Sequence, residues 1–381
     1  MSDPRPDSGS RRSDGRDAVD ANGRTSVSVP GKLILMGEHA VVYHRPALVA
    51  AVDLRLRVTL ADRESEGVHI RLPQVGVDEH VSWGTVLEYA RHSREKWREF
   101  SRRPTSSAFQ EVRGVDPAHV VKIALGEAAS AFGESTIRPL DVEVASEIPI
   151  GAGFGSSAST GVGIVAAYLA HCGFASDPQT IDRLALDVER RQHGLPSGVD
   201  HATVLRGGIT WARKNPSGAV FMEPVVAVST LRSRMRVYDT GTPSDSTGAV
   251  VSAVRGRLDA MPAEAERILD RMEDATRAFR QQLTQRTEEP LAVVEMIREV
   301  QRCLERLGVV PEPVAELVRR IEEHGGAAKI SGAGALKGPG AGCLLVYHPE
   351  PGAVRQWPFL ESVRRHELHL GAEGLRGEIP G

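Results

Sequence analysis

The chain has 381 residues, which is enough for one large domain or two medium domains with full hydrophobic cores. Hydrophobic residues make up 41% and charged residues 25%, and the formal net charge is -3, so the charge balance argues against a nucleic-acid or polybasic membrane-binding surface. The three cysteines lie far apart without a C-x-x-C pair, and no apolar run approaches the roughly 20 residues of a membrane helix, which argues against disulfides, zinc sites and a membrane span.

The first part of the chain is expected to form a tail followed by short strands. Residues 1–25 consist largely of Arg, Asp, Ser and Gly and lack the apolar core of a signal peptide, so we expect a disordered tail and a cytoplasmic protein. The next segments have strand-like composition: residues 27–29, 33–36 and 54–60. Residues 80–132 have a helical pattern with a polar interruption at 101–107, which we expect to be a surface loop.

Strands and helices follow one another irregularly over the rest of the chain. Further strands are expected at residues 141–146, 208–212, 235–238, 328–330, 343–347 and within 367–370. Helices are expected at 161–170, at 180–192 with Gly194 as C-cap, and from Thr247 onward in segments that end near Gln282, Leu307 and His324. Because there is no regular βαβ alternation, the pattern predicts an α+β fold.

The most informative segment is residues 149–160, PIGAGFGSSAST, between a predicted strand and a predicted helix. Its glycines allow a tight turn whose N–H groups can approach an anion, and the helix adds N–H donors and the positive end of its dipole. A P-loop would need a lysine at the helix start, and a dinucleotide fingerprint would need a third glycine and a later acidic residue at fixed offsets; neither is present. The segment is therefore either a tight strand-to-helix connection or another kind of phosphate cradle, with the hydroxyls of Ser156 and Ser157 placed for a phosphate or a metal.

Candidate charged groups stand in other segments. Glu189 lies near the buried stripe of a predicted helix, and Asp200 follows a Pro-Ser-Gly turn. They are either two solvated acids or, beside a phosphate cradle, a Mg²⁺ ligand and the group that receives or orients a hydroxyl proton. Lys32 opens an apolar strand, where its side chain either snorkels to water or serves the site, and His39 is compatible with a satisfied core histidine. A second glycine cluster at residues 329–343 fits a hairpin loop or a ligand-covering lid.

Taken together, four segments resemble the motifs of one kinase superfamily. The first motif is PGKLILMGEHAVVY at residues 30–43, the second is PIGAGFGSSAS at 149–159 and the third is KISGAGALKGPGAGC at 329–343; a further segment, GLPSGVD at 194–200, lies between the second and the third. These are similar to the motifs of the galactokinase, homoserine kinase, mevalonate kinase and phosphomevalonate kinase (GHMP) superfamily and look most like those of the mevalonate kinases. The resemblance implies an α+β GHMP kinase fold: an N-terminal domain at 26–225 like the second domain of ribosomal S5, a C-terminal helical α+β domain at 226–381, and an active site between them.

The resemblance also implies a role for each matching residue. Asp200 would be the catalytic carboxylate acting on the acceptor hydroxyl, and Lys32 would lower the pKa of that hydroxyl and steady the transferring phosphoryl charge. The ATP phosphates would be bound by Gly151, Ala152, Gly153, Phe154, Gly155, Ser156 and Ser157. Mg²⁺ would be held by Ser157 and Glu189, and the substrate would be contacted by Glu38, His39, Thr247 and Gly332.

The implied reaction is ATP- and Mg²⁺-dependent phosphorylation of the 5-hydroxyl of mevalonate, a small-molecule substrate of isoprenoid biosynthesis, and a homodimer is a possible assembly. Two departures from the family pattern leave the acceptor open. Residues 335–339 lengthen the third motif and add Lys337, and Asp245 stands where mevalonate kinases often have a basic or neutral residue. The alternatives are a phosphomevalonate kinase or a decarboxylase acting on a phosphorylated mevalonate, and a non-catalytic sensor that kept the fold.

Overall fold

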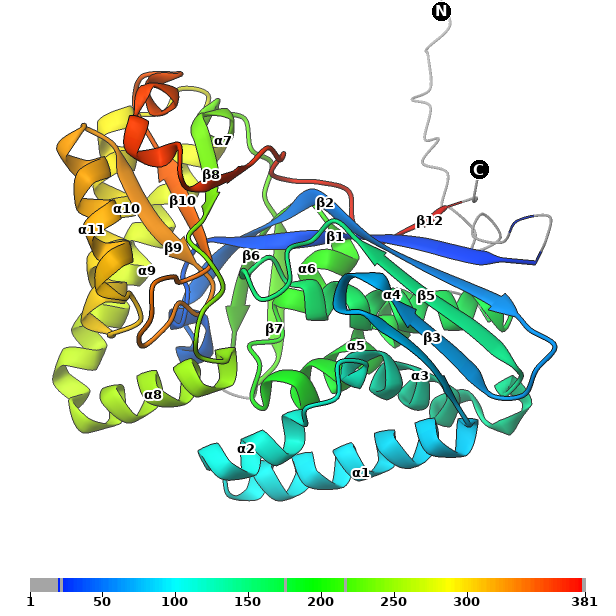
Figure 1. Cartoon of the computed structure of the whole chain (residues 1–381). Helices are drawn as coiled ribbons and strands as arrows, with labels where there is room; N and C mark the ends of the chain where they lie inside the picture. Colours follow the sequence, from blue (N-terminus) through cyan, green and yellow to red (C-terminus); the bar gives the residue numbers. More distant parts are fainter. Residues whose placement is uncertain (1–19, 21–22, 175–176, 216–217, 379–381) are drawn as a thin grey trace, which may run out of the picture.

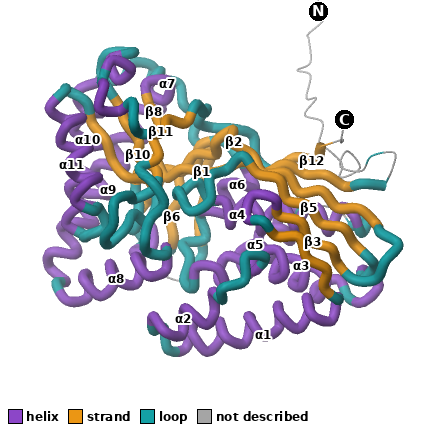
Figure 2. The backbone as a smooth tube through the Cα atoms, viewed as in Figure 1, coloured by secondary structure: helices purple, strands orange, loops and turns teal. Residues whose placement is uncertain are grey.

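The computed structural model of the protein describes residue 20 and residues 23–174, 177–215 and 218–378 (Figure 1). Most of the tail predicted at 1–25 lies outside the described residues, and Thr25 at its end already begins a strand. The chain forms a larger mixed sheet and a smaller antiparallel sheet, each covered by helices, which confirms the predicted α+β class (Figure 2).

The larger sheet contains eight strands within the described residues. They are β1 (Thr25–Met36), β2 (Pro46–Asp62), β3 (Val68–Leu72), β4 (Val77–Val81), β5 (Leu140–Ser146), β6 (Ile209–Lys214), β7 (Val220–Pro224) and β12 (Arg376–Glu378). Their order is β12-β1-β2-β5-β3-β4, with β6 on β2 and β7 on β6, and β3 runs parallel to β5 while the other pairs are antiparallel. The short strands β3, β4 and β7 were not predicted from the sequence.

β1 and β2 form the centre of this sheet and carry the first motif. β1 is one continuous strand where two runs were predicted, and its pairing with β2 shifts register between Pro30 and Gly31 and again between Ile34 and Met36. Proline cannot donate to a sheet ladder, so an irregularity at this point is expected. β2 is long enough to pair with β6 through residues 46–50 and with β5 through residues 56–62.

The smaller sheet has the order β11-β8-β10-β9, with all pairs antiparallel. Its strands are β8 (Met235–Asp239), β9 (Ala327–Ser331), β10 (Cys343–Tyr347) and β11 (Arg364–His366). The terminal strand predicted within 367–370 was placed wrongly: β11 ends at His366, and Leu370 forms only an isolated bridge with Val52 of the other sheet. The pairing partner β8, which is distant in sequence, decides where this strand lies.

Eleven α-helices lie within the described residues. They are α1 (Trp83–Arg102), α2 (Ser106–Arg113), α3 (His119–Phe132), α4 (Ser156–His171), α5 (Pro178–His193), α6 (Asp200–Arg206), α7 (Leu231–Arg234), α8 (Thr247–Ala260), α9 (Pro262–Thr284), α10 (Pro290–Arg306) and α11 (Glu312–Glu323). α4 and α6 contact β1 and β2, α3 and α5 pack on α4, and α10 and α11 cover β9 of the smaller sheet (Figure 1). None of these helices combines the length and apolar composition that a membrane crossing needs.

The predicted helical region at 80–132 is three helices, not one interrupted helix. β4 occupies residues 77–81 at its start, and the helices are separated at residues 103–105 and 114–118. α5 confirms its prediction: Asp177 caps its first N–H groups, Pro178 occupies the first turn, and Gly194 closes it with φ 77°. The short helix α6, which begins at Asp200, was not predicted.

The helix that follows the glycine-rich loop is anchored directly on the larger sheet. Most residues of α4 are buried, and many of them are glycine, alanine or serine, which lets the helix axis approach the strands closely. A Cβ on Gly163 would lie 2.8 Å from Val58 and 3.2 Å from Val29, so only glycine fits between the helix and β1 and β2. This contact sets the position of the N-terminus of α4.

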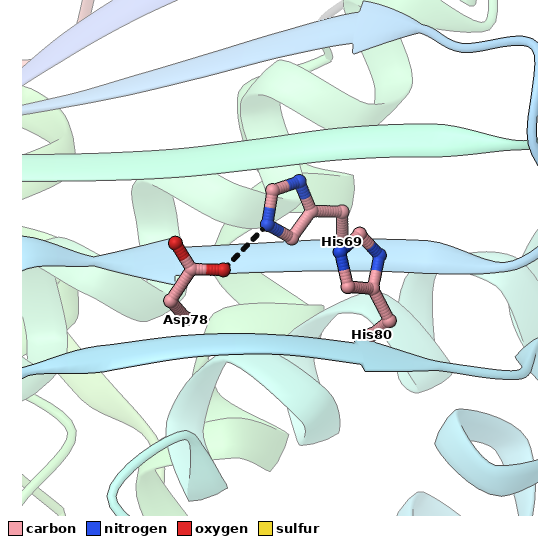
Figure 3. A group of neighbouring side chains, drawn as sticks. All are labelled: His69, Asp78 and His80. Carbon is pink, nitrogen blue, oxygen red and sulfur yellow. Dashed lines mark hydrogen bonds and ion pairs between the residues drawn. The ribbon is translucent and has the colours of Figure 1, made fainter.

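The uncovered face of β3 and β4 carries a polar network (Figure 3). His69 lies between two carboxylates, with Nδ1 3.1 Å from Asp141 and Nε2 2.8 Å from Asp78, and its ring stacks on His80 at 4.0 Å. The ligand-type atoms of His69, Asp78 and His80 lie within 4.8 Å of one another, a spacing compatible with a cation. Arg63 donates to Nδ1 of His80 over 3.0 Å, however, so a neutral His80 has its proton on Nε2 and a guanidinium stands beside the group. The geometry is that of a solvent-facing ion-pair network.

Candidate active site

A cavity of about 660 Å³ lies between the two sheets and collects residues from all four sequence motifs. The predicted site residues in its wall are Lys32, His39, Gly151, Gly153, Phe154, Gly155, Ser156, Ser157, Glu189, Asp200, Thr247 and Gly332. These come from β1 and the turn after it, the loop before α4 and the first residues of α4, the end of α5, the start of α6, the start of α8 and the loop after β9. Segments far apart in sequence thus converge on one site.

Two of the predicted residues are not in the cavity wall. Ala152 is buried, and its carbonyl accepts the N–H of Cys343 over 3.0 Å, which joins the second motif to the third. Glu38 is fully buried and forms an ion pair with Lys329 of β9. Burial raises the pKa of Glu38, and the Lys329 ammonium opposes that rise. Glu38 therefore connects the first motif to the third by a buried ion pair. Because it lies outside the cavity wall, we do not propose the predicted contact between Glu38 and the substrate.

The loop before α4 offers backbone donors to the cavity. Gly155 is the N-cap residue with φ 77°, and no side chain caps the helix. The first N–H groups of an α-helix have no intrahelical partner, and Ser156 and Ser157, which carry two of them, line the cavity. A Cβ on Gly155 would lie 2.7 Å from Cγ of Lys32, which explains why glycine stands there. The loop is therefore built to hold an anion beside the lysine.

Lys32 and Asp200 form an ion pair in the cavity wall. Nζ of Lys32 lies 3.1 Å from Oδ2 of Asp200, and their side chains are 5% and 25% exposed. The backbone N–H of Lys32 donates to the carbonyl of Phe154 over 2.8 Å, so β1 is hydrogen-bonded to the glycine-rich loop before α4. An ammonium, a carboxylate and a helix N-terminus thus share one partly enclosed space.

Ser157 and Glu189 are hard oxygen donors on the same cavity. Oγ of Ser157 lies 2.9 Å from Nε2 of His193, and Oε2 of Glu189 forms a short hydrogen bond with Nδ1 of His201. Burial lowers the pKa of His193, so it is neutral near pH 7. Mg²⁺ prefers oxygen ligands and keeps several waters. A hydroxyl and a carboxylate close to the N–H groups at the start of α4 are therefore ligands that suit Mg²⁺.

The third motif closes the cavity on the side of the smaller sheet. Nε2 of His39 donates to the carbonyl of Ala333 over 2.9 Å, and burial lowers the pKa of His39. Oδ2 of Asp245 accepts the N–H of Leu336 over 2.9 Å, so the two departures from the family pattern, the longer loop and the acidic residue, are in direct contact. Lys337 is exposed and is not among the described residues of the cavity wall.

Three residues at or beside the site were not predicted from the sequence. His193 lies four residues after Glu189 on α5, and this spacing alone places both on one helix face. Arg113 at the end of α2 reaches the cavity wall, and nothing in its local sequence marks it. His201 contacts Glu189 only because α6 folds against α5, so local patterns do not reveal it.

Comparisons with known proteins agree with this geometry. The GHMP kinases N terminal domain matches residues 119–208. A mevalonate kinase of Mus musculus is 30% identical over 362 residues, which cover 84% of this chain and 85% of the relative.

Solved structures share the fold over nearly the whole chain. The mevalonate kinase of Methanococcus jannaschii has a TM-score of 0.70 at 18% identity and covers 91% of this chain and 98% of that chain. The phosphomevalonate kinase of Streptococcus pneumoniae in complex with phosphomevalonate and AMPPNP has a TM-score of 0.64 at 16% identity and covers 91% and 99%. The fold, the motifs and the relatives agree: the chain belongs to the GHMP kinase family and is an ATP-dependent small-molecule kinase.

Proposed function

We propose that this kinase transfers the γ-phosphoryl group of ATP to the 5-hydroxyl of mevalonate in a Mg²⁺-dependent reaction. The observation that carries the proposal is the 3.1 Å ion pair between Lys32 and Asp200 in a cavity that also receives the N-terminus of α4. Phosphoryl transfer depends mainly on positioning and on electrostatic stabilisation of the transferring group. The carboxylate of Asp200 and the ammonium of Lys32, beside the N–H donors at the start of α4, supply both.

The side chains of the pair have separate tasks in this proposal. Asp200 receives or orients the proton of the acceptor hydroxyl. Lys32 places its positive charge beside the attacking oxygen and the phosphoryl oxygens, where negative charge develops. Gly155 supports this by leaving room for the lysine stem, since any larger residue would contact Cγ of Lys32.

The phosphates and Mg²⁺ would be held on the neighbouring wall. The N–H groups at the start of α4 suit the phosphate oxygens, and Ser157 and Glu189 would hold Mg²⁺. When bound, Mg²⁺ neutralises phosphate charge during transfer.

The identity of the acceptor rests on two supports. The mevalonate kinase of Mus musculus is a relative that covers 84% of this chain, and the wall near Thr247 contains a carboxylate, Asp245. Mevalonate already carries one carboxylate, and a phosphorylated mevalonate carries further negative charge, so the Asp245 carboxylate repels the phosphorylated acceptor more strongly than mevalonate itself. The competing candidate, a kinase or decarboxylase for a phosphorylated mevalonate, drew on both departures from the family pattern: the altered segment at Asp245 and the extra cation Lys337, which is exposed outside the cavity wall.

The test is turnover of Mg²⁺–ATP to ADP against mevalonate, 5-phosphomevalonate, 5-diphosphomevalonate, galactose and homoserine. We expect fast turnover with mevalonate alone and a phosphomonoester product. Turnover only with a phosphorylated acceptor would refute the proposal in favour of the competing candidate, and release of CO₂ would identify a decarboxylase.

The role of Asp200 has its own prediction. Asp200→Asn keeps the size of the side chain and removes its charge, so we expect turnover to fall by about 10²–10⁴-fold while nucleotide affinity changes little. Steady-state kinetics and calorimetric nucleotide titration measure the two quantities. Wild-type turnover in the asparagine variant would rule out the assigned role.

A further inference from the structure

The environment of Glu189 contains a second, fully engaged histidine. His201 is 2% exposed and lies on α6, and its Nδ1 donates the short hydrogen bond to Oε2 of Glu189. Its Nε2 lies 3.5 Å from Oδ1 of Asp182. Both carboxylates belong to α5, where residues seven apart lie two turns apart on the same face. His201 therefore bridges two carboxylates of one helix.

The bridge is placed beside the reacting groups by chain connectivity. Asp200, which pairs with Lys32, directly precedes His201 at the start of α6. Consecutive helical residues point about 100° apart, so the first turn of α6 directs one side chain to Lys32 and the next to Glu189.

The hydrogen bond has a consequence for how Glu189 can bind a cation. Oε2 is engaged by His201, so Oε1 is the oxygen left for a ligand in the cavity. A buried carboxylate with one oxygen held has a fixed orientation, and such supports commonly set the geometry of a metal ligand.

We propose that His201 is a positioning residue for the Mg²⁺ site: it holds Oε2 of Glu189, is itself held by Asp182, and so presents Oε1 as a single-oxygen ligand to the cation. This inference rests on the proposed function in taking Mg²⁺–ATP as the ligand. It adds a residue, an anchor and a binding mode that the motifs do not specify.

Two substitutions of His201 separate its two contacts. Asn places an N–H donor near the position of Nδ1 and keeps the bond to Glu189, whereas Gln places its amide near Nε2, toward Asp182, and loses it. His171→Gln is the matched control, because the side chain of His171 is also buried and forms hydrogen bonds with Thr25 and Asp62, outside the cavity wall.

The experiment is calorimetric titration of each full-length variant with a non-transferable ATP analogue over a series of Mg²⁺ concentrations. We expect His201→Gln to need roughly 10-fold more Mg²⁺ for the same gain in nucleotide affinity, and His201→Asn and His171→Gln to stay close to wild type. Affinity for the analogue without Mg²⁺ should be equal in all four proteins, since a general loss of structure would lower it.

The inference is overturned if His201→Gln follows the wild-type Mg²⁺ dependence, if Asn and Gln lose affinity equally, or if the loss persists without Mg²⁺. If the glutamine variant does not fold, Asp182→Ala replaces it, because it removes the anchor and leaves His201; an unchanged Mg²⁺ dependence there overturns the inference as well. A wild-type protein that binds the Mg²⁺–nucleotide but does not phosphorylate mevalonate would refute the proposed acceptor alone.

Discussion

Burial of a single histidine in the cavity wall makes the free energy of unfolding depend on pH. His119 at the start of α3 is 5% exposed, and its Nδ1 lies 2.9 Å from the hydroxyl of Tyr89. Burial lowers the pKa of His119 to about 4 from its ordinary value of 6.5. Because the folded state holds this imidazole neutral, the unfolded state binds more protons between these two values, and stability must fall as the pH decreases through that window.

We therefore predict that His119→Asn flattens the acid side of the stability curve. The histidine contributes stability that is present above about pH 6.5 and lost as the pH falls toward 4, up to roughly 3 kcal/mol from a single group of this kind. Urea unfolding of wild type and variant at a series of pH values measures the slope. Parallel curves for the two proteins over this range would contradict the assignment.

At the scale of elements, the two loops that depart from the family pattern form one unit. Asp245 accepts the N–H of Leu336, and a Cβ on Gly338 would lie 2.3 Å from Oγ of Ser244, so the longer loop rests closely on the segment before α8. Asp245 also lines the cavity. The contact holds the loop beside the cavity, at the wall that includes Thr247, a residue predicted to contact the substrate.

Asp245→Ala should release this loop. A charge-assisted hydrogen bond contributes about 1.5–3 kcal/mol, so we expect amide hydrogen exchange at residues 332–342 to speed up by at least about 10-fold and KM for the acceptor to rise while nucleotide affinity stays the same. Asp245→Asn keeps a carbonyl acceptor and is the control. Unchanged exchange in the alanine variant would show that the contact does not hold the loop.

At the scale of the whole molecule, the C-terminus holds the larger sheet together. β12 pairs with β1, the guanidinium of Arg55 donates to the carbonyls of Glu373 and Gly374, and Leu375 donates to the carbonyl of Leu205. The main buried cluster runs through both sheets without interruption. The boundary predicted at residues 225/226 and the predicted homodimer stay predictions, but the chain does return to its first sheet at its end.

Ending the chain after residue 371 should therefore destabilise the whole protein. Several backbone hydrogen bonds are lost at about 1 kcal/mol each and the edge of β1 is exposed, so we expect the melting temperature to fall by on the order of 5 °C. Because the core is continuous, a single calorimetric transition should remain. A melting temperature equal to that of the full chain would mean that these contacts contribute nothing.

Local sequence was sufficient for the features that depend on a few neighbouring residues. Gly194 ends α5 as predicted, whereas the helix begins at Pro178, capped by Asp177, slightly before the predicted start at residue 180. The glycines of residues 149–160 followed by small residues specify a turn and a closely packed helix. The motif residues of the cavity wall were predicted from the resemblance of four short segments to the GHMP kinase motifs, which can be recognised without the fold. The short strands β3 and β4 were missed because they exist through pairing with other segments: β3 pairs with β5, which is distant in sequence, and β4 pairs with β3 at the end of the sheet.

The sequence by itself determined the class of fold, the kinase family and most of the groups that meet in the cavity. Only the tertiary structure decided which partners those groups have: Glu38 turns to Lys329, 291 residues away, instead of the cavity, and His201 holds Glu189 from another helix. The physical reason is range. Caps, turns and helix dipoles act within one or two turns of chain, whereas a buried ion pair exists only when packing brings its two charges together and excludes water.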